Sequence, residues 1–383
     1  MDFRLPEELV AFKDSLRRFI EKEVLPHEAR VQRDGLDRGL ARELSEKTRA
    51  AGWWFLDLPE SAGGQGLSLL GMSVFWEEVS RTVAIPARDT DIFGPVVGPI
   101  VGGLQGAQAE RYLQPVMRGE KRVCFAQTEP DAGADPAGMR TRAVLKDGYY
   151  LLNGRKRFIT AADRADFATV FAVTDPVEGM ERPVSCLLVD MTMPGVRIAR
   201  LQETMMGERP CEIEFENVEV PAENLVGVEG GGFRLAQKWI NHGRIRHGAR
   251  ACGVAERCIE LAASYAKQRK TFGAPLADRQ AVQWMLADSY TDVHATRLMV
   301  QNAAWRADQG EDVRAESYMV KLFGDEMGFR AADRCMQIHG GIGLTLDLPI
   351  ERFWRDQRSF LITEGPSEVM RMAIARHVLR QYG

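Results

Sequence analysis

Two changes of hydrophobic pattern divide this chain into three parts, and they limit its fold more than any other feature. From about residue 5 to 121, apolar residues recur at spacings of three and four, which is typical of amphipathic helices. The next hundred residues hold short runs of β-formers between turn residues, and then long helical patterns return. We therefore expect an α+β protein with an N-terminal helical domain (1–121), a middle antiparallel β domain (122–226) and a C-terminal four-helix bundle (227–383).

Chain length and residue spacing refine this outline. At 383 residues the chain exceeds the roughly 250 to 300 residues at which one hydrophobic core stops growing, so two or more domains are expected. Asp-Gly, Asn-Gly, proline and charged turns separate the predicted strands, which cover 149–152, 167–173, 184–191, 196–201 and 211–220. The predicted long helices cover 233–270, 276–309, 312–339 and 366–380. Gly243, Gly248 and Gly253 interrupt the first of them, which indicates close helix packing or a bend.

Charge and cysteine content exclude several classes of function. The net charge is −4 and the charged fraction is 27%, so the chain lacks the basic footprint of a nucleic-acid-binding protein. Its six cysteines are scattered, without Cys-x-x-Cys or histidines at ligand spacing, so we assign no disulfide and no metal. The N-terminus is acidic and lacks the order of a signal peptide. Because the apolar run 93–104 is too short to span a bilayer, we expect a soluble, cytoplasmic protein.

Several enzyme motifs are missing from the sequence. Glycine-rich pieces occur at 230–232 and 340–343, but neither follows a strand inside a βαβ unit, which disfavours a nicotinamide-binding Rossmann domain. There is no Gly-x-Ser-x-Gly and no His-Glu-x-x-His, so serine and zinc hydrolysis are poor interpretations.

Two tracts in the middle part carry the most specific signal. VCFAQTEPDAGADPAG covers residues 123–138, and NGRKRFIT covers 153–160. Either tract alone is most simply a loop or a hairpin turn, because Thr-Glu-Pro, Asp-Ala-Gly and Asn-Gly all form turns. In this order and at this spacing they resemble the flavin-cradling middle domain of the acyl-CoA dehydrogenase family. The order of helical, β and helical parts is similar to that family as well, so the resemblance covers essentially the whole chain.

The resemblance implies that FAD is the cofactor. The positions that match flavin-ring segments are Phe125, Gln127, Thr128, Gly133, Ala134, Phe158 and Thr160, with the Thr160 hydroxyl near flavin N5. Two further segments resemble those that reach the pyrophosphate and adenine of a neighbouring subunit's FAD, and they contain Arg269, Thr271, Phe272, Gln280, Gln337, Gly340 and Gly341. The turn into the last helix adds Pro366, Ser367 and Glu368. Taken alone, the two further segments also fit a basic helix end and a glycine C-cap.

An acid near the end of the chain is the candidate catalytic base. Glu364 lies in the stretch LITEGPSEVM, which resembles the segment that carries the family's base. Two apolar residues precede it and a glycine follows, so we expect its carboxylate to be partly shielded from water, as suits a general base. The alternative is an acid that the helix macrodipole favours near a helix N-terminus, and this alternative stays open for Glu368.

Four residues match the family's substrate-binding positions, namely Ala134, Asn241, Arg244 and Gly365. Arg244 corresponds to an arginine near the CoA end of the substrate channel, and Asn241 stands where several members have an acid. Gly243 occupies the position from which the isovaleryl branch supplies its base. Because glycine cannot do so, this position strengthens the assignment of Glu364.

Three positions depart from the family's usual residues. Ala134 replaces Ser or Thr, Phe158 replaces Trp, and Pro366 replaces Thr, so that hydroxyl and amide donors are lost. These changes resemble a branch whose members tend to accept larger or branched acyl groups.

The resemblance implies an oxidoreductase of fatty acid metabolism that desaturates an acyl-CoA thioester between Cα and Cβ. It also implies electron-transfer flavoprotein as the acceptor and a homo-oligomer, either a dimer or a homotetramer. Two alternatives remain. One is an acyl-CoA oxidase or flavin monooxygenase on the same fold, and the other is a non-catalytic flavin- or CoA-binding protein.

Overall fold

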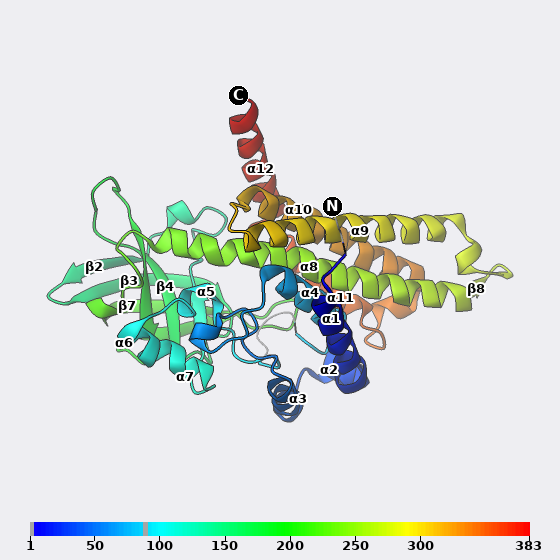
Figure 1. The fold of residues 1–383 in the computed structure, drawn as a ribbon, viewed down its shortest axis with the longest axis horizontal. Helices are drawn as coiled ribbons and strands as arrows, with labels where there is room; N and C mark the ends of the chain where they lie inside the picture. The colour runs from blue at the N-terminus through cyan, green and yellow to red at the C-terminus, as the bar shows by residue number, and fades with distance from the viewer. Residues whose placement is uncertain (1–3, 87–90) are drawn as a thin grey trace. The chain divides into compact units, whose positions relative to one another are not determined.

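The computed structural model describes residues 4–86 and 91–383. It contains two compact units. The sheet unit consists of Thr48–Gln65 and Phe93–Ile240, and the helical unit consists of Met1–Lys47, Gly66–Ile92 and Asn241–Gly383. Helices from both ends of the chain thus share the helical unit (Figure 1).

One mixed sheet dominates the sheet unit. Its strands are β1 (Val123–Ala126), β2 (Arg142–Lys146), β3 (Tyr149–Ile159), β4 (Phe167–Val173), β5 (Val184–Asp190), β6 (Val196–Leu201) and β7 (Cys211–Pro221). The strand order is β1-β4-β2-β3-β7-β6, and β5 pairs with β4. Pairing is antiparallel except that β1 runs parallel to β4, and Arg142 of β2 meets Val173 of β4 in parallel. The expectation of a purely antiparallel sheet is therefore wrong at β1, where a long connection lets the chain return in the same direction.

The Asn-Gly pair inside β3 does not form the turn that its sequence predicts. Strand β3 continues through Asn153 and Gly154, with a register shift against β7 between Leu152 and Gly154. Gly154 has φ 146°, and a Cβ placed there would lie 2.5 Å from Thr141 Oγ1. Close backbone approach at a bulge, and not chain reversal, is the reason for glycine here.

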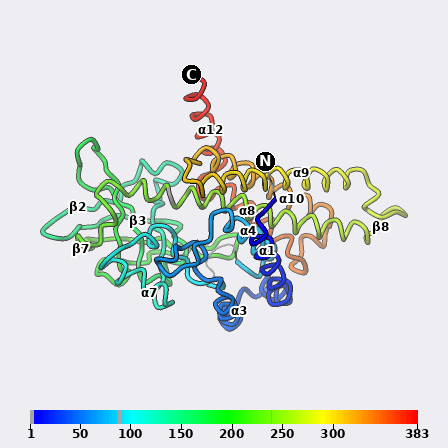
Figure 2. The backbone as a smooth tube through the Cα atoms, viewed as in Figure 1, coloured from blue at the N-terminus to red at the C-terminus, as the bar shows by residue number. Residues whose placement is uncertain are grey.

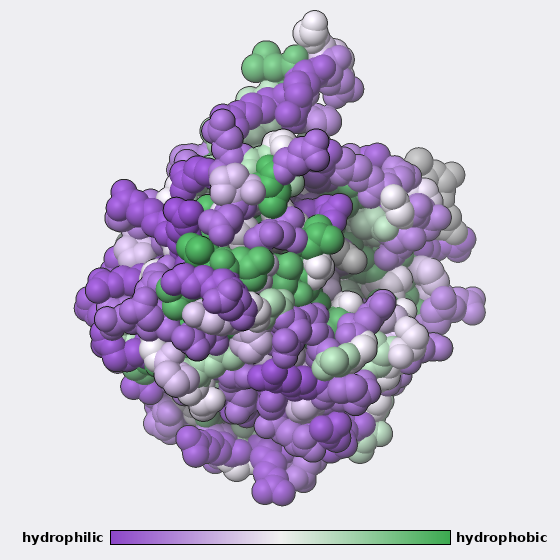
Figure 3. Space-filling model, turned by 90° about the vertical axis from the view of Figure 1, so that its left-hand side faces the viewer, coloured by the Kyte–Doolittle hydropathy of each residue, from purple (hydrophilic) through white to green (hydrophobic). Residues whose placement is uncertain are grey.

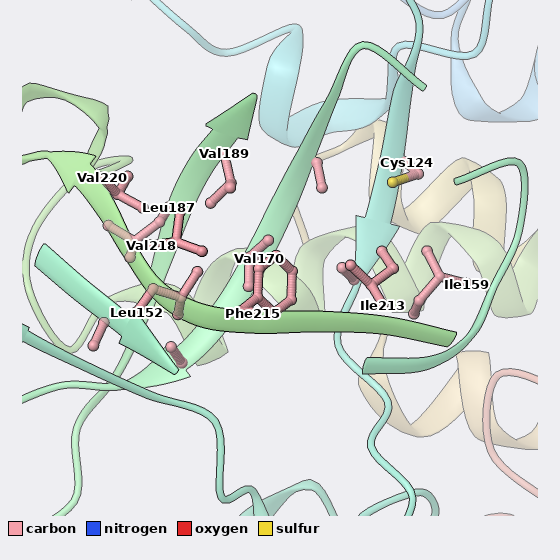
Figure 4. Packing of buried hydrophobic residues seen from close by; sticks show 14 of the residues in the cluster. Cys124, Leu152, Ile159, Val170, Leu187, Val189, Ile213, Phe215, Val218 and Val220 are labelled. Atoms are coloured by element: carbon pink, nitrogen blue, oxygen red, sulfur yellow. The ribbon is translucent and has the colours of Figure 1, made fainter. Parts of the chain in front are cut away.

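Alternating side chains build the core of the sheet unit. Figure 4 shows buried apolar residues of the sheet strands, such as Leu152, Val170 and Ile213, gathered in one cluster. A second cluster contains Phe167 and Phe171 of β4 together with residues of the short helices α5 (Gly98–Val101) and α7 (Gln114–Met117). The short helix α6 (Gly106–Gln108) lies between these two helices in the sequence. Strands β4 and β5 are buried almost throughout, which explains their continuous apolar sequence.

Nine longer helices belong wholly or partly to the helical unit as described. They are α1 (Glu7–Phe19), α2 (Glu28–Asp34), α3 (Arg38–Ala50), α4 (Leu69–Val79), α8 (Gly232–Gln268), α9 (Gln280–Asp308), α10 (Arg314–His339), α11 (Ile350–Phe360) and α12 (Ser367–Tyr382). The four predicted long helices correspond to α8, α9, α10 and α12. Helix α11 is additional. A short hairpin of β8 (Lys270–Thr271) and β9 (Ala274–Pro275) joins α8 to α9, and α9 packs along α10 (Figure 2).

Glycines in α8 serve close helix packing. A Cβ on Gly248 would lie 2.4 Å from Val320 Cγ1 of α10, and one on Gly253 would lie 1.9 Å from the Glu77 carbonyl oxygen of α4. Since α8 is one continuous helix, the packing explanation is confirmed for these two residues. All six cysteines are buried free thiols. Within residues 4–86 and 91–383, none of the helices has the length and apolar character needed to cross a bilayer.

Candidate active site

Glu364 stands at a strained turn of the helical unit. It lies between α11 and α12 with φ 55°, in the left-handed region, and Gly365 follows with φ 105°. A left-handed backbone costs a residue with a side chain roughly 1–2 kcal/mol, so packing around the turn must hold it in place. Helix α12 begins only at Ser367, and the Glu364 side chain is 25% exposed. The carboxylate is thus partly shielded from water, as expected.

Residues on one face of α8 lie against the Glu364 carboxylate. Arg246 Nη2 donates to Glu364 Oε1 over 2.6 Å, and His247 Nε2 lies 3.5 Å from the same oxygen. A Cβ on Gly243 would come within 1.9 Å of Glu364 Oε2. Residues 243, 246 and 247 are three and four positions apart, so they share a helix face. Glycine at 243 leaves room for the carboxylate, and Arg246 stabilises its ionised form, which is the form that can accept a proton.

The other substrate-binding candidates of the helical unit lie beside Glu364. Arg244 is buried, its guanidinium lies 4.7 Å from the centre of the Tyr318 ring, and its Nη1 donates to Asn241 Oδ1 over 3.1 Å. Burial lowers the pKa of Arg244, although Tyr318 and Glu364 oppose the shift. A Cβ on Gly365 would lie 3.6 Å from Arg244 Nη2. Asn241, Arg244, Glu364 and Gly365 therefore form one group.

In the sheet unit, a buried ion pair joins the two tracts, 123–138 and 153–160, that resemble flavin-binding segments. Lys156 Nζ donates to Glu129 Oε1 over 2.8 Å and to the Gln127 carbonyl over 3.0 Å. The Arg157 backbone N–H donates to the Thr128 carbonyl over 2.8 Å. Strand β3 thus holds Gln127 and Thr128 in place, and the structure brings together the tracts that the sequence paired.

Glu129 also closes the loop that contains Gly133 and Ala134. Its two carboxylate oxygens accept the backbone N–H groups of Arg140 (2.6 Å) and Thr141 (2.9 Å). Burial lowers the pKa of Lys156 to about 8, and Glu129 opposes this shift. Burial in turn acts to raise the pKa of Glu129, but Lys156 and the backbone donors bring it below its usual value. Gly133 and Ala134 themselves are exposed.

Two exposed phenylalanines have a left-handed backbone conformation, as Glu364 does. Phe158 has φ 58° and is 56% exposed, and Phe272 has φ 50° and is fully exposed. Thr160 is half-buried just after β3. Phe125 instead packs within its own unit, because its ring stacks on Trp239 with centroids 5.3 Å apart. Apolar residues also reach the surface on the face drawn in Figure 3, where they lie among polar ones.

The remaining FAD candidates lie around two ends of the helical unit's long helices. Arg269, Thr271 and Phe272 belong to the β8–β9 hairpin region, and Gln280 begins α9. Gln337 lies in the last turn of α10, and the exposed Gly340 and Gly341 follow it. The cluster that contains Leu276, after the hairpin, also contains Ile338, so the two segments are neighbours. Arg244 is 24 residues before the end of α8 at Gln268, which is about 36 Å of helix. A single chain therefore keeps the hairpin group and the Glu364 group apart.

Comparison with known proteins tests the resemblance to the acyl-CoA dehydrogenase family. Residues 6–120, 124–218 and 230–379 match the family models described as acyl-CoA dehydrogenase N-terminal, middle and C-terminal domains. The chain belongs to the acyl-CoA dehydrogenase family. The mouse (Mus musculus) short-chain specific acyl-CoA dehydrogenase is 34% identical over 99% of this chain and 92% of that protein. Butyryl-CoA dehydrogenase from Megasphaera elsdenii has a similar structure, with a TM-score of 0.86, 31% identity and coverage of 99% and 100%.

A third relative is named as a subunit of a reductase complex. The caffeyl-CoA reductase-Etf complex subunit CarC of Acetobacterium woodii is 36% identical over 89% of this chain and 90% of that protein. The acyl-CoA dehydrogenase family is FAD-dependent, and its members are oxidoreductases. The present chain is thus an oxidoreductase of this family, as its sequence predicted.

Sequence reasoning gave no role to several residues that support this family site. Glu129 and Lys156 stand inside the quoted tracts, and their opposite charges were the one available signal, but their pairing depends on how the loop returns to β3. His247, Asp325 and Lys321 form a buried chain next to Glu364. Nothing in the spacing of residues 247 and 325 marks them as partners.

Proposed function

We propose that this chain binds FAD and desaturates an acyl-CoA thioester, with Glu364 as the base that removes the α proton. The observation that carries the proposal is the position of the Glu364 carboxylate, which is partly buried, paired with Arg246 and accommodated by the missing side chain at Gly243. The backbone N–H of Glu364 is the proposed donor to the thioester oxygen, as in an oxyanion hole.

The residues that would hold FAD fit its chemistry in both units. Phe158 presents an exposed ring that suits a planar aromatic ring system, and Gln127 and Thr128 are fixed beside its strand. Gly340 and Gly341 have no other atom within 4 Å of a would-be Cβ, so phosphate oxygens can approach their backbone. Arg269 is exposed and suits phosphate through its planar guanidinium. When bound, FAD accepts the β hydride.

We further propose that each FAD site takes residues from two subunits. The roughly 36 Å of α8 between Arg244 and the hairpin is too long for one chain to place both groups on the same flavin nucleotide. A homo-oligomer, whether dimer or tetramer, removes the difficulty, because the hairpin of one subunit can complete the site of another. Electron-transfer flavoprotein is the proposed electron acceptor, by analogy with the Acetobacterium woodii complex.

A second candidate function is the same reaction in reverse. The name of the Acetobacterium woodii relative favours it, because that protein is a reductase subunit. In that direction Glu364 would have to be protonated, so that it could deliver the α proton to an enoyl-CoA. The residues and their positions are the same in both cases, and the kinetics of reduction and reoxidation distinguish the two directions.

An anaerobic titration tests the proposal. Purified protein is mixed with a panel of straight-chain, branched and aryl-substituted acyl-CoAs, and loss of oxidised-flavin absorbance is followed. We expect at least one acyl-CoA to bleach the wild-type flavin, and Glu364→Gln to keep flavin and ligand binding while the rate falls by roughly 10²–10⁴-fold. Glu8→Gln, on the exposed face of α1, is the matched control. Wild-type reduction rates in Glu364→Gln would refute the assignment.

Exposure of the reduced protein to oxygen distinguishes a dehydrogenase from an oxidase. The reduced protein is exposed to oxygen and assayed for peroxide, and rapid peroxide formation during turnover would favour an acyl-CoA oxidase over a dehydrogenase. If no acyl-CoA bleaches the flavin and no enoyl-CoA reoxidises the reduced protein, a non-catalytic flavin- or CoA-binding protein is the better description.

A further inference from the structure

A chain of buried polar side chains lies behind Glu364 in the helical unit. His247 of α8 is 3% exposed, and its Nδ1 lies 3.2 and 3.3 Å from the two carboxylate oxygens of Asp325 on α10. Asp325 is completely buried and accepts from Lys321 Nζ over 2.8 Å. On its other side, His247 Nε2 faces Glu364 Oε1 at 3.5 Å.

We infer that His247 is a positioning residue that shares the proton which Glu364 takes from the substrate. The inference rests on the proposed function of Glu364. Because Asp325 can only accept, it fixes the proton of a neutral His247 on Nδ1 and leaves the lone pair of Nε2 facing Glu364. Once the carboxyl group is protonated, its O–H can donate to Nε2, and the proton can move from Oε1 to Nε2.

The proton balance of this step is simple. One proton leaves the substrate α carbon for Glu364 and is then shared with His247, and no electrons move between these side chains. An imidazolium at His247 would face a carboxylate on each side, Asp325 at Nδ1 and Glu364 at Nε2. In the reverse reaction the same ring returns the proton to Glu364, so the acid is ready to donate.

The surroundings of His247 hold the ring in this position. Its ring packs on Phe360 with centroids 4.6 Å apart, and Lys321 Nζ donates to the Phe360 carbonyl over 2.9 Å. Phe360 ends α11, directly before the turn that carries Glu364. The charged groups that face this ring or its partners are Asp325 and Lys321 of α10, Glu364 after α11, and Arg246 and Arg244 of α8.

The pair of Lys321 and Asp325 is otherwise hard to explain. A buried ion pair is a weak source of stability, because desolvation of both ions offsets most of their attraction. Here the lysine neutralises the aspartate, so that the aspartate can orient a histidine without leaving an unbalanced buried charge. In this arrangement Asp325 fixes the tautomer of His247, and His247 in turn faces Glu364.

Rapid mixing with the acyl-CoA that reduces the wild-type protein fastest tests the inference. We expect His247→Phe to bind flavin and ligand normally while the rate of flavin reduction falls by about 10²-fold, since small misplacements of a catalytic group cost that much. His247→Gln can hydrogen-bond but cannot hold a proton, so it should restore part of the rate.

Two further variants guard against a purely structural effect. Asp325→Asn keeps the packing, but its amide N–H would donate to Nδ1 and force the ring proton onto Nε2, so the rate should fall as in His247→Phe. His294→Phe, at an exposed position of α9, is the control and should behave as wild type. A wild-type rate of flavin reduction in His247→Phe, or a loss of rate that only follows flavin content, would overturn the inference. If no acyl-CoA reduces the wild-type flavin and no enoyl-CoA reoxidises the reduced protein, the proposed function fails, and the inference fails with it.

Discussion

Replacing Gly243 by alanine should slow catalysis without lowering the stability of the fold. The new Cβ would lie 1.9 Å from Glu364 Oε2, whereas ordinary contacts begin near 3.4 Å, so the carboxylate must move by about 1.5 Å. The clashing atom is the end of a flexible side chain and can move at little cost to the fold. Alanine also improves helix propensity over glycine by roughly 1 kcal/mol. We therefore expect stability to be unchanged or slightly raised.

The rate of proton removal by Glu364 should fall in the same variant. Because a displacement of about 1 Å can cost 10²-fold in rate, flavin reduction by acyl-CoA should slow by about 10²-fold in Gly243→Ala, with flavin content and thermal midpoint preserved. Stopped-flow absorbance and thermal unfolding measure the two quantities on one sample.

Gly248→Ala, five residues further along α8, is the contrasting variant. Its Cβ would meet Val320 Cγ1 at 2.4 Å in a packed helix interface, so it should lower stability by about 1–3 kcal/mol. A Gly243→Ala protein that is reduced as fast as wild type would refute the placement of Glu364 against α8.

Three further changes test other parts of the structure. Glu129→Gln should lower flavin content and remove part of the acid sensitivity of folding. The native pKa of Glu129 lies below its ordinary 4.5, so its contribution to the free energy of unfolding is present above pH 4.5 and is lost as pH falls below that value. Acid titration followed by circular dichroism measures this loss. Gly154→Ala should destabilise the protein by about 1–3 kcal/mol in urea unfolding, because its Cβ would lie 2.5 Å from Thr141 Oγ1; an unchanged midpoint would contradict the bulge explanation. Phe272→Ala should weaken FAD binding in equilibrium dialysis without loss of helix content, whereas Tyr290→Ala, also exposed, should leave FAD binding unchanged.

The sequence predicted the main elements because their periodicity is strong. Helices α8, α9, α10 and α12 follow from apolar spacing, and β4 and β5 follow from continuous runs of β-formers. Helix α11 was missed because it is short and rich in charged residues. The Asn-Gly pair at 153–154 was misinterpreted because a local turn signal cannot reveal that Thr141 passes next to Gly154.

The candidate site, like the fold, was predicted from the sequence only in part. Glu364 and Gly243 could be named from sequence because each stands in a recognisable stretch. The contact between them, and the partnership of His247 with Asp325, depend on how α8, α10 and the turn after α11 pack. Tertiary packing of this kind leaves no trace in local spacing, so the supporting residues appear only in three dimensions.

The left-handed backbone shared by Phe158, Phe272 and Glu364 has a consequence for engineering. Glycine at any of the three would relieve a conformational penalty of roughly 1–2 kcal/mol and, by that effect alone, make the fold more robust. Each replacement would also delete a side chain that we assign to cofactor or substrate. Searches for thermostable variants that ignore turnover should therefore accumulate glycine at these positions, whereas searches that demand turnover should never do so.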